Sequence, residues 1–301
     1  MTTLLDSPSL AKADHTGPNL LRLIRAEIAK IRTTKTWWLL ALGIVAFTAL
    51  AFTVNAFGHH FELYPPPDAR PGDPGEQAQI AQAHTAAGLA KIAADMMTSG
   101  QFFGLLLAMI MGILVVTNEF FHQTATTTFM TSPHRTTVVL AKTVAAILFG
   151  GLFWLVSTAL DLAATPIYLN SQHVSVSITQ WTVVQSALLN LLAFAIWAIF
   201  GMGLGTLLRS QIGSVVTGMA LYLLGTAAVA ILVHVLNNLI HRDWVITAQV
   251  AAPAIASAIM ITPGRAFPHA PPQWVGGAVL IGYAIITGFV GILIMRRRDI
   301  S

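Results

Sequence analysis

The side chains best suited to chemistry lie in one polar stretch between two long apolar runs. This stretch, VVTNEFFHQTATTTFMTSPHR, covers Val115–Arg135 and contains Glu119 and His122. The chemistry that these residue types favour is ion pairing. The Glu119 carboxylate lies where an apolar run ends, so it can tie this stretch to a basic group on a neighbouring element, such as the N-terminal helix. The alternative is an ordinary solvated acid at a helix end.

Other polar motifs give weaker indications of chemistry. His59, His60 and Glu62 form a loose group, but it lacks a helical register and a fourth ligand for a metal. The run GMGLG does not match the dinucleotide motif G-x-G-x-x-G, whereas Gly201 and Gly205 have the spacing of small-residue helix packing. Protease and hydrolase motifs of the H-E-x-x-H and G-x-S-x-G types are absent. We therefore expect no metal and no catalytic residue in this chain.

The composition indicates a membrane protein. Of 301 residues, 55 % are hydrophobic and 9 % are charged, and the mean hydropathy is +0.71. Soluble domains carry roughly 25 % charged residues, so this chain has too few charges to cover a water-facing surface. It contains no Cys, which excludes disulfides and thiolate chemistry.

About 20 apolar residues cross the hydrocarbon layer as a helix. The sequence predicts an all-α membrane protein with six such helices, whose outer loops are residues 58–97, 166–182 and 241–273. The predicted spans are Trp37–Phe57, Thr98–Thr117, Val138–Thr165, Val183–Leu208, Ser214–Ile240 and Trp274–Met295.

Basic residues give the orientation. With six spans, twelve Lys and Arg fall on the cytoplasmic side and four on the outer side, so both termini are expected in the cytoplasm of a cell with this chain in its plasma membrane. A seventh crossing at Val245–Thr262 would place Arg296–Arg298 outside. Pro253 also interrupts that segment, so we expect a helix or re-entrant hairpin at the outer face instead.

The N-terminal region is expected to form two parts before the transmembrane domain of residues 36–298. Residues 1–18 are predicted to be a disordered cytoplasmic tail. Residues 19–35 have apolar residues at helical spacing and basic residues mostly on the other face, which predicts an amphipathic helix lying along the inner leaflet. A plain cytosolic helix is the alternative.

With this topology, residues 118–134 form the one substantial cytoplasmic protrusion between the first span and the C-terminus. It carries Phe120, Phe121, Phe129 and Met130 on a Thr-rich background. A short amphipathic helix that docks in the groove of a partner protein would present such residues. The alternative is a helix that lies on the membrane surface.

These segments resemble the membrane subunits (permeases) of ABC type-2 exporters. In that family the second span ends in a Glu-aromatic-basic-His-Gly-Thr pattern, which here reads Glu119-Phe120-Phe121-His122-Gln123-Thr124. A small-Pro-basic turn ending at Arg135 and the segment VVLAK follow in both. Phe121 and Gln123 stand where the family has a basic residue and Gly. The distinctive similarity covers residues 25–38 and 116–142.

The resemblance implies that residues 118–134 are a coupling helix that contacts a separate ATP-binding-cassette ATPase subunit. Two copies of that ATPase subunit are expected, and they, not this chain, would bind ATP and Mg. No Lys in this chain follows Gly, so it has no P-loop of its own and is not itself an enzyme. A second permease copy or a related chain, and membrane lipids, are the other implied partners; nucleic acid is not. The residues implied in coupling are Glu119, Phe120, Phe121, His122, Thr124, Phe129, Met130 and Arg135.

The second and fifth spans are implied to line a path for a hydrophobic or amphipathic compound such as a drug, lipid or peptide. Phe102, Phe103, Leu106 and Met109 are its candidate walls, and ordinary helix packing is the alternative for them. Asp161, the acid inside an apolar span, either lines this path or is a structural, hydrogen-bonded acid. The alternative function is an antibiotic-sensing or immunity module of the same architecture, without bulk transport.

Because the chain has no Cys, the single substitutions Arg70→Cys, Arg135→Cys and Arg298→Cys test this topology directly. A membrane-impermeant maleimide applied to intact cells should label only Arg70→Cys, since the other two positions are expected in the cytoplasm. Labelling of position 135 or 298 from outside would reverse the orientation. The Cys-free chain is the control.

Overall fold

In this computed structural model, residues 19–65, 74–122 and 135–297 are described, and they form helices and no strand. The predicted disordered tail, residues 1–18, lies outside the described residues. So does most of the predicted coupling helix, including Thr124, Phe129 and Met130.

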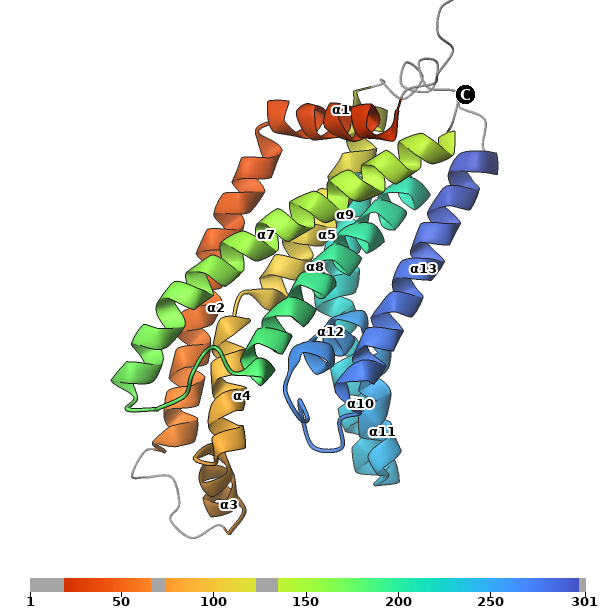
Figure 1. Ribbon diagram of the computed structural model, residues 1–301. Coiled ribbons are helices and arrows are strands. Elements are labelled where there is room, and N and C mark those ends of the chain that lie inside the picture. Colours follow the sequence, from red (N-terminus) through yellow and green to blue (C-terminus); the bar gives the residue numbers. More distant parts are fainter. Residues whose placement is uncertain (1–18, 66–73, 123–134, 298–301) are drawn as a thin grey trace, which may run out of the picture.

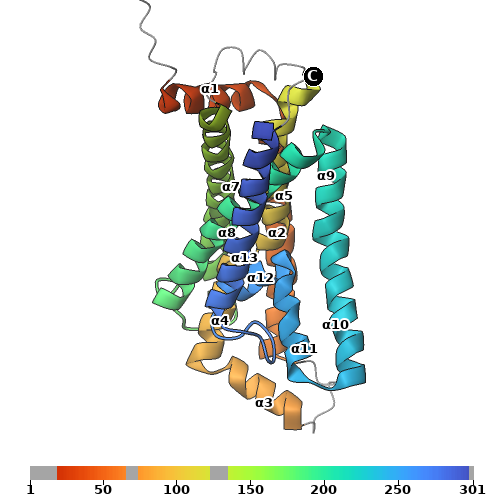
Figure 2. The same cartoon turned by 90° about the vertical axis from the view of Figure 1, so that its right-hand side faces the viewer.

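Six helical segments in the described part of the chain are long and apolar enough to cross a membrane, as the sequence predicted. Several of them run side by side in a bundle, with α1 (Leu20–Thr33) across one end (Figures 1 and 2). The six segments are α2 (Thr36–Leu63), α4 (Ala86–Met97) with α5 (Gln101–Phe121), α7 (Arg135–Ser171), α8 (Trp181–Leu208), α9 (Gln211–Ala220) with the π-helix η1 (Leu221–Gly225) and α10 (Thr226–Ile240), and α13 (Gln273–Arg297).

Several span boundaries differ from the prediction; the first span, for example, was expected to end at Phe57, but α2 continues to Leu63. The third span was expected to end at Thr165, before Pro166, but α7 continues through the proline to Ser171. A proline inside a helix removes one backbone donor, and contacts around the last turns offset this loss. The Tyr168 hydroxyl donates to the Ala56 carbonyl of α2 at 3.1 Å, and Leu169 is buried.

The second span is longer than predicted at both ends. It begins with α4, which a break at Thr98–Gly100 separates from α5, and α5 continues four residues past the expected end at Thr117, to Phe121. Asn118–Phe121 therefore forms the last turn of α5. The short α3 (Pro74–Ala83) precedes α4 at the end of the bundle opposite α1 (Figure 1).

The core is centred on α5, which packs closely against α8. Glycines allow this approach: a Cβ on Gly201 would lie 1.9 Å from the Met109 carbonyl oxygen, and one on Gly112 would lie 2.0 Å from that of Ala198. Such small-residue contacts let two helix backbones approach within a membrane. The packing role expected for Gly201 is confirmed.

The segment between the fifth and sixth spans does not run straight. It forms α11 (Asp243–Thr247), the 3-10 turn η2 (Ala248–Ala251) and α12 (Pro253–Ile261), with a bend of 102° before α12. Buried hydrogen bonds hold α12 in the bundle: the Trp197 indole donates to Ser257 Oγ at 2.8 Å, and the Gln101 amide donates to the Ser257 carbonyl at 3.2 Å. A bend of this size occurs in a broken span or in a re-entrant loop, so the hairpin at the outer face stays a prediction.

We expect Gly201→Ala to lower the thermal unfolding midpoint of the protein in detergent. The added methyl group must push α5 and α8 apart, and overpacking of this kind costs about 1–3 kcal/mol. Gly282→Ala in α13 is the matched control, because a Cβ there meets no atom within 4 Å. Equal midpoints for the two variants would show that the α5–α8 contact is not tight.

Candidate functional site

Helix α1 lies across the end of the bundle and turns one face toward it (Figure 1). Its N-cap residue Asn19 accepts a hydrogen bond from the Leu21 backbone N–H at 3.4 Å. The buried residues of α1 are Glu27 and Ile31, four positions apart on the same face, while Arg22 and Arg25 are exposed. The inward face therefore contains a carboxylate, which needs a partner in the bundle.

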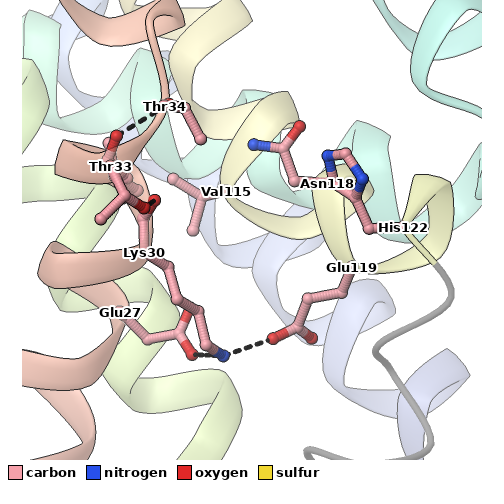
Figure 3. A pocket seen from close by; sticks show the side chains of 9 residues that line it. Glu27, Lys30, Thr33, Thr34, Val115, Asn118, Glu119 and His122 are labelled. Carbon is pink, nitrogen blue, oxygen red and sulfur yellow. Dashed lines mark hydrogen bonds and ion pairs between the residues drawn. The ribbon is translucent and has the colours of Figure 1, made fainter.

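Four charged side chains meet beneath α1. Lys142 Nζ lies 2.7 Å from Glu27 Oε2 and 2.9 Å from Glu119 Oε1. Lys30 Nζ lies 2.7 Å from Glu27 Oε1 and 2.8 Å from Glu119 Oε1. Figure 3 marks both ion pairs with dashed lines. Lys142 also donates to the Val115 carbonyl at 3.3 Å. We call Glu27, Lys30, Glu119 and Lys142 the charge cluster.

The charge cluster is largely shielded from solvent. Lys142 is 1 % exposed, Glu27 5 % and Glu119 6 %, whereas the Lys30 side chain is 47 % exposed. Two carboxylates face two ammonium groups, so the cluster has no net charge when all four are ionised. Removing one member of a buried ion pair leaves an uncompensated charge and is strongly destabilising.

Lys30 lies outside the spans, and its neighbours favour its charged form. Burial of the ammonium acts against the charge, but the hydrogen bonds and charges of Glu119 and Glu27 outweigh it and raise the pKa of Lys30 above the ordinary 10.5. The stabilisation from Lys30 is therefore complete below a pH of about 10.5 and is lost as the pH rises through the raised pKa.

The charge cluster joins three elements. Glu27 and Lys30 come from α1, Glu119 from the last turn of α5, and Lys142 from the first turns of α7. The segment of residues 123–134 connects these ends of α5 and α7. A cavity of about 300 Å³ opens beside the cluster, lined among others by Thr33, Asn118 and His122 (Figure 3).

The predicted coupling residues that the structure describes have different environments. Phe120 packs against Val116 and Met202, and the Arg209 guanidinium lies 5.9 Å from its ring centre. Phe121 is 64 % exposed and His122 is exposed beside it. Arg135 is the first residue of α7. The ion pair expected between Glu119 and the N-terminal helix is present, and its role in coupling stays a prediction.

Sequence reasoning did not identify Glu27 or Lys142 as site residues. A signal was present for Lys142, because it is a lone charge within the apolar run VVLAKTVAAIL. Glu27 gave a weaker signal: it is an acid on the apolar face of an otherwise basic amphipathic helix. Only the packing of α1 on α5 and α7 shows that the two side chains meet.

The predicted path residues divide into two sets. Phe102 and Phe103 line a second cavity, of about 490 Å³, between α2, α5 and α12. Leu106 and Met109 are 6 % and 0 % exposed and belong to the core.

Asp161 is buried in α7, with 1 % of its surface exposed. The backbone of Gly100 approaches its carboxylate, but neither carboxylate oxygen has a hydrogen-bond partner of good geometry in the described part of the chain. Asp161 does not line the second cavity, although Gly100 lies between two residues that do, Ser99 and Gln101.

The outer histidines do not converge on one point. His59 Nδ1 lies 2.9 Å from Glu62 Oε2, whereas His60 Nδ1 lies 2.8 Å from the Gln172 side-chain oxygen. Among the described residues, no three His, Asp or Glu side chains are grouped to hold a metal ion.

Comparison of the sequence with models of known protein families and with curated proteins finds no match. The charge cluster, the cavities and the six apolar helices are therefore the basis for functional inference. Together they describe a helical, multi-pass membrane protein with a buried charge cluster at one end.

We expect Lys142→Met to destabilise the protein by about 3–5 kcal/mol, because two buried carboxylates would then share one half-exposed ammonium. Thermal unfolding in detergent measures this loss. The double variant Glu119→Gln/Lys142→Met should cost less than the sum of the single variants. Lys35→Met, at an exposed position, is the control. If the stability loss of the double variant equals the sum of the two single losses, Glu119 and Lys142 do not interact as described.

Proposed function

We propose that this chain is the membrane subunit of an ATP-driven exporter of the ABC type-2 class, powered by separate ATP-binding subunits. The observation that carries the proposal is the charge cluster, which ties α1 to both helices that flank residues 123–134. A subunit driven from outside needs a stiff connection between the segment that receives the force and the helices that move.

The geometry suggests how force would be transmitted. Closure of the ATPase subunits on ATP would push the coupling helix, residues 118–134. Glu119 lies in the last turn of α5 and Lys142 in the first turns of α7, and both are paired within the charge cluster. The three helices α1, α5 and α7 would therefore move as a unit. Helix α5 runs through the core against α8, so a shift at its end reaches the opposite half of the bundle.

The cargo in this proposal is a hydrophobic or amphipathic compound that leaves the cell between two permease copies. Phe102 and Phe103 at the start of α5 line an accessible cavity, which supports their predicted place on the path. The chain would lie in the plasma membrane with both termini on the cytoplasmic side and α1 along the inner leaflet. The proposal assigns no ATP hydrolysis to this chain.

Co-purification tests the proposal. The chain, tagged and extracted from native membranes, should bring down a nucleotide-hydrolysing ATPase. Phe129→Asp and Met130→Asp should remove most of the bound ATPase, because a charge would enter an apolar docking surface. Glu119→Gln should retain the ATPase but lose most export, because the connection to α1 is weakened.

The control is Phe61→Asp, an exposed aromatic residue on α2 at the end opposite α1. It should leave ATPase binding unchanged. Wild-type levels of bound ATPase and of ATP turnover in all of the coupling variants would remove the coupling-helix assignment.

A further inference from the structure

The second cavity lies in the half of the bundle remote from α1. It is an open cavity lined by α2, by the break between α4 and α5, and by the end of α12. Its volume of about 490 Å³ falls within the range of pockets that hold drug-sized molecules. Its apolar lining residues are Leu50, Ala51, Val54, Phe102, Phe103 and Ile261.

Aromatic rings form one wall of this cavity in a fixed arrangement. Phe102 and Phe103 meet edge to face at 5.1 Å between ring centres, and Phe47 stacks on Phe103 at 4.6 Å. The Tyr222 hydroxyl in the π-helix η1 donates to the Phe102 carbonyl at 2.6 Å, which fixes the start of α5. Phe102 is nevertheless 43 % exposed, so its ring is available to a ligand.

The cavity carries a negative charge with little to balance it. Asp95 is the one carboxylate among its described lining residues, and no Lys or Arg lines it. The side chain of Asp95 is 26 % exposed, and His59 Nε2 lies 3.9 Å from Asp95 Oδ2. Lys91 and Glu62, whose charges act on Asp95 in opposite directions, line a separate cavity together with Arg265.

The neutral polar groups of the cavity already have partners. Asn55 donates to Ser99 Oγ at 3.1 Å, and Gln101 donates to the Ser257 carbonyl. Within the described part of the chain, the closest charged group to the Asp95 carboxylate is His59 at 3.9 Å, so this carboxylate is the group most able to bind a ligand. A cation beside it would also face the Phe102 ring, and aromatic faces attract cations.

We propose that this cavity binds a monovalent organic cation with an apolar, aromatic body. The Asp95 carboxylate would neutralise the charge, while Phe102, Phe103 and Val54 would contact the body. This inference rests on the proposed export function, for which it names the class of compound carried. Anionic compounds are disfavoured because they would face the Asp95 carboxylate in a cavity that no Lys or Arg lines.

Equilibrium dialysis of the full chain in detergent tests the site. Tetraphenylphosphonium is the cationic probe and triphenylphosphine oxide its uncharged counterpart, with empty micelles subtracted. The wild type should bind the cation at least about tenfold more tightly than the oxide, the size of effect expected for a partly desolvated charge beside a carboxylate and an aromatic ring. Asp95→Asn should remove this preference and leave the affinity for the oxide unchanged.

Three variants complete the test. Asp95→Glu should keep the preference for the cation, Phe102→Ala should weaken binding of both probes, and Asp243→Asn, at an exposed carboxylate on α11, should change neither. If Asp95→Asn elutes as an aggregate, the binding results for Asp95→Glu and Phe102→Ala test the proposed site instead. Equal affinity of the wild type for both probes, or unchanged binding by Asp95→Asn or Phe102→Ala, overturns the proposal.

The same preparations separate this inference from the proposed function. Since dialysis uses the chain without its ATPase, cation binding and ATPase co-purification are independent readouts. If the chain shows no preference for the cation but still co-purifies with the ATPase, the cation site is ruled out and the export function is not. Cation binding with no ATPase partner supports the site and removes the export function.

Discussion

Charges that are withdrawn from water must be balanced, and this constraint organises the end of the molecule that carries α1. Glu27, Glu119 and Lys142 are almost fully buried, and the ion pairs that each Glu forms with Lys142 and Lys30 offset the cost of burying these charges. The position of α1 across the bundle follows from this requirement as well as from its apolar residues. A slide of α1 along the bundle would separate Glu27 from Lys142.

The core meets a different requirement, because within a membrane the packing of helices depends on close van der Waals contact. Gly112 on α5 and Gly201 on α8 remove the side chains that would hold the two backbones apart. Helix α5 is therefore fixed by ion pairs at one end and by close packing along its length. These two kinds of contact join the polar end to the aromatic cavity at the start of the same helix.

The sequence was sufficient for features that depend on local composition. Runs of apolar residues predicted six membrane helices, and the spacing of Gly201 and Gly205 predicted helix packing. It was less reliable at boundaries: the third span was expected to end at Thr165, but α7 continues to Ser171, where the contacts of Tyr168 and Leu169 with other helices hold the last turns in place. Propensity cannot include contacts between elements far apart in the chain.

The candidate sites show the same limit. Glu119 was recognisable from its position at the end of an apolar run, and a basic partner on the N-terminal helix was a reasonable expectation. Glu27 and Lys142 are 115 residues apart, and nothing in the sequence pairs them. The cavity around Asp95 is similarly a product of three packed segments: Phe102 was a candidate wall residue from the sequence, but Asp95 was not.

The neutrality of the charge cluster has an electrical consequence. Work done by a transmembrane voltage is proportional to the charge that moves through it, about 2.3 kcal/mol for each elementary charge across 100 mV. Two Glu and two Lys that travel together carry no net charge. If the charge cluster moves as a unit, as the proposed function requires, its own four charges therefore add no net electrical work at any membrane potential.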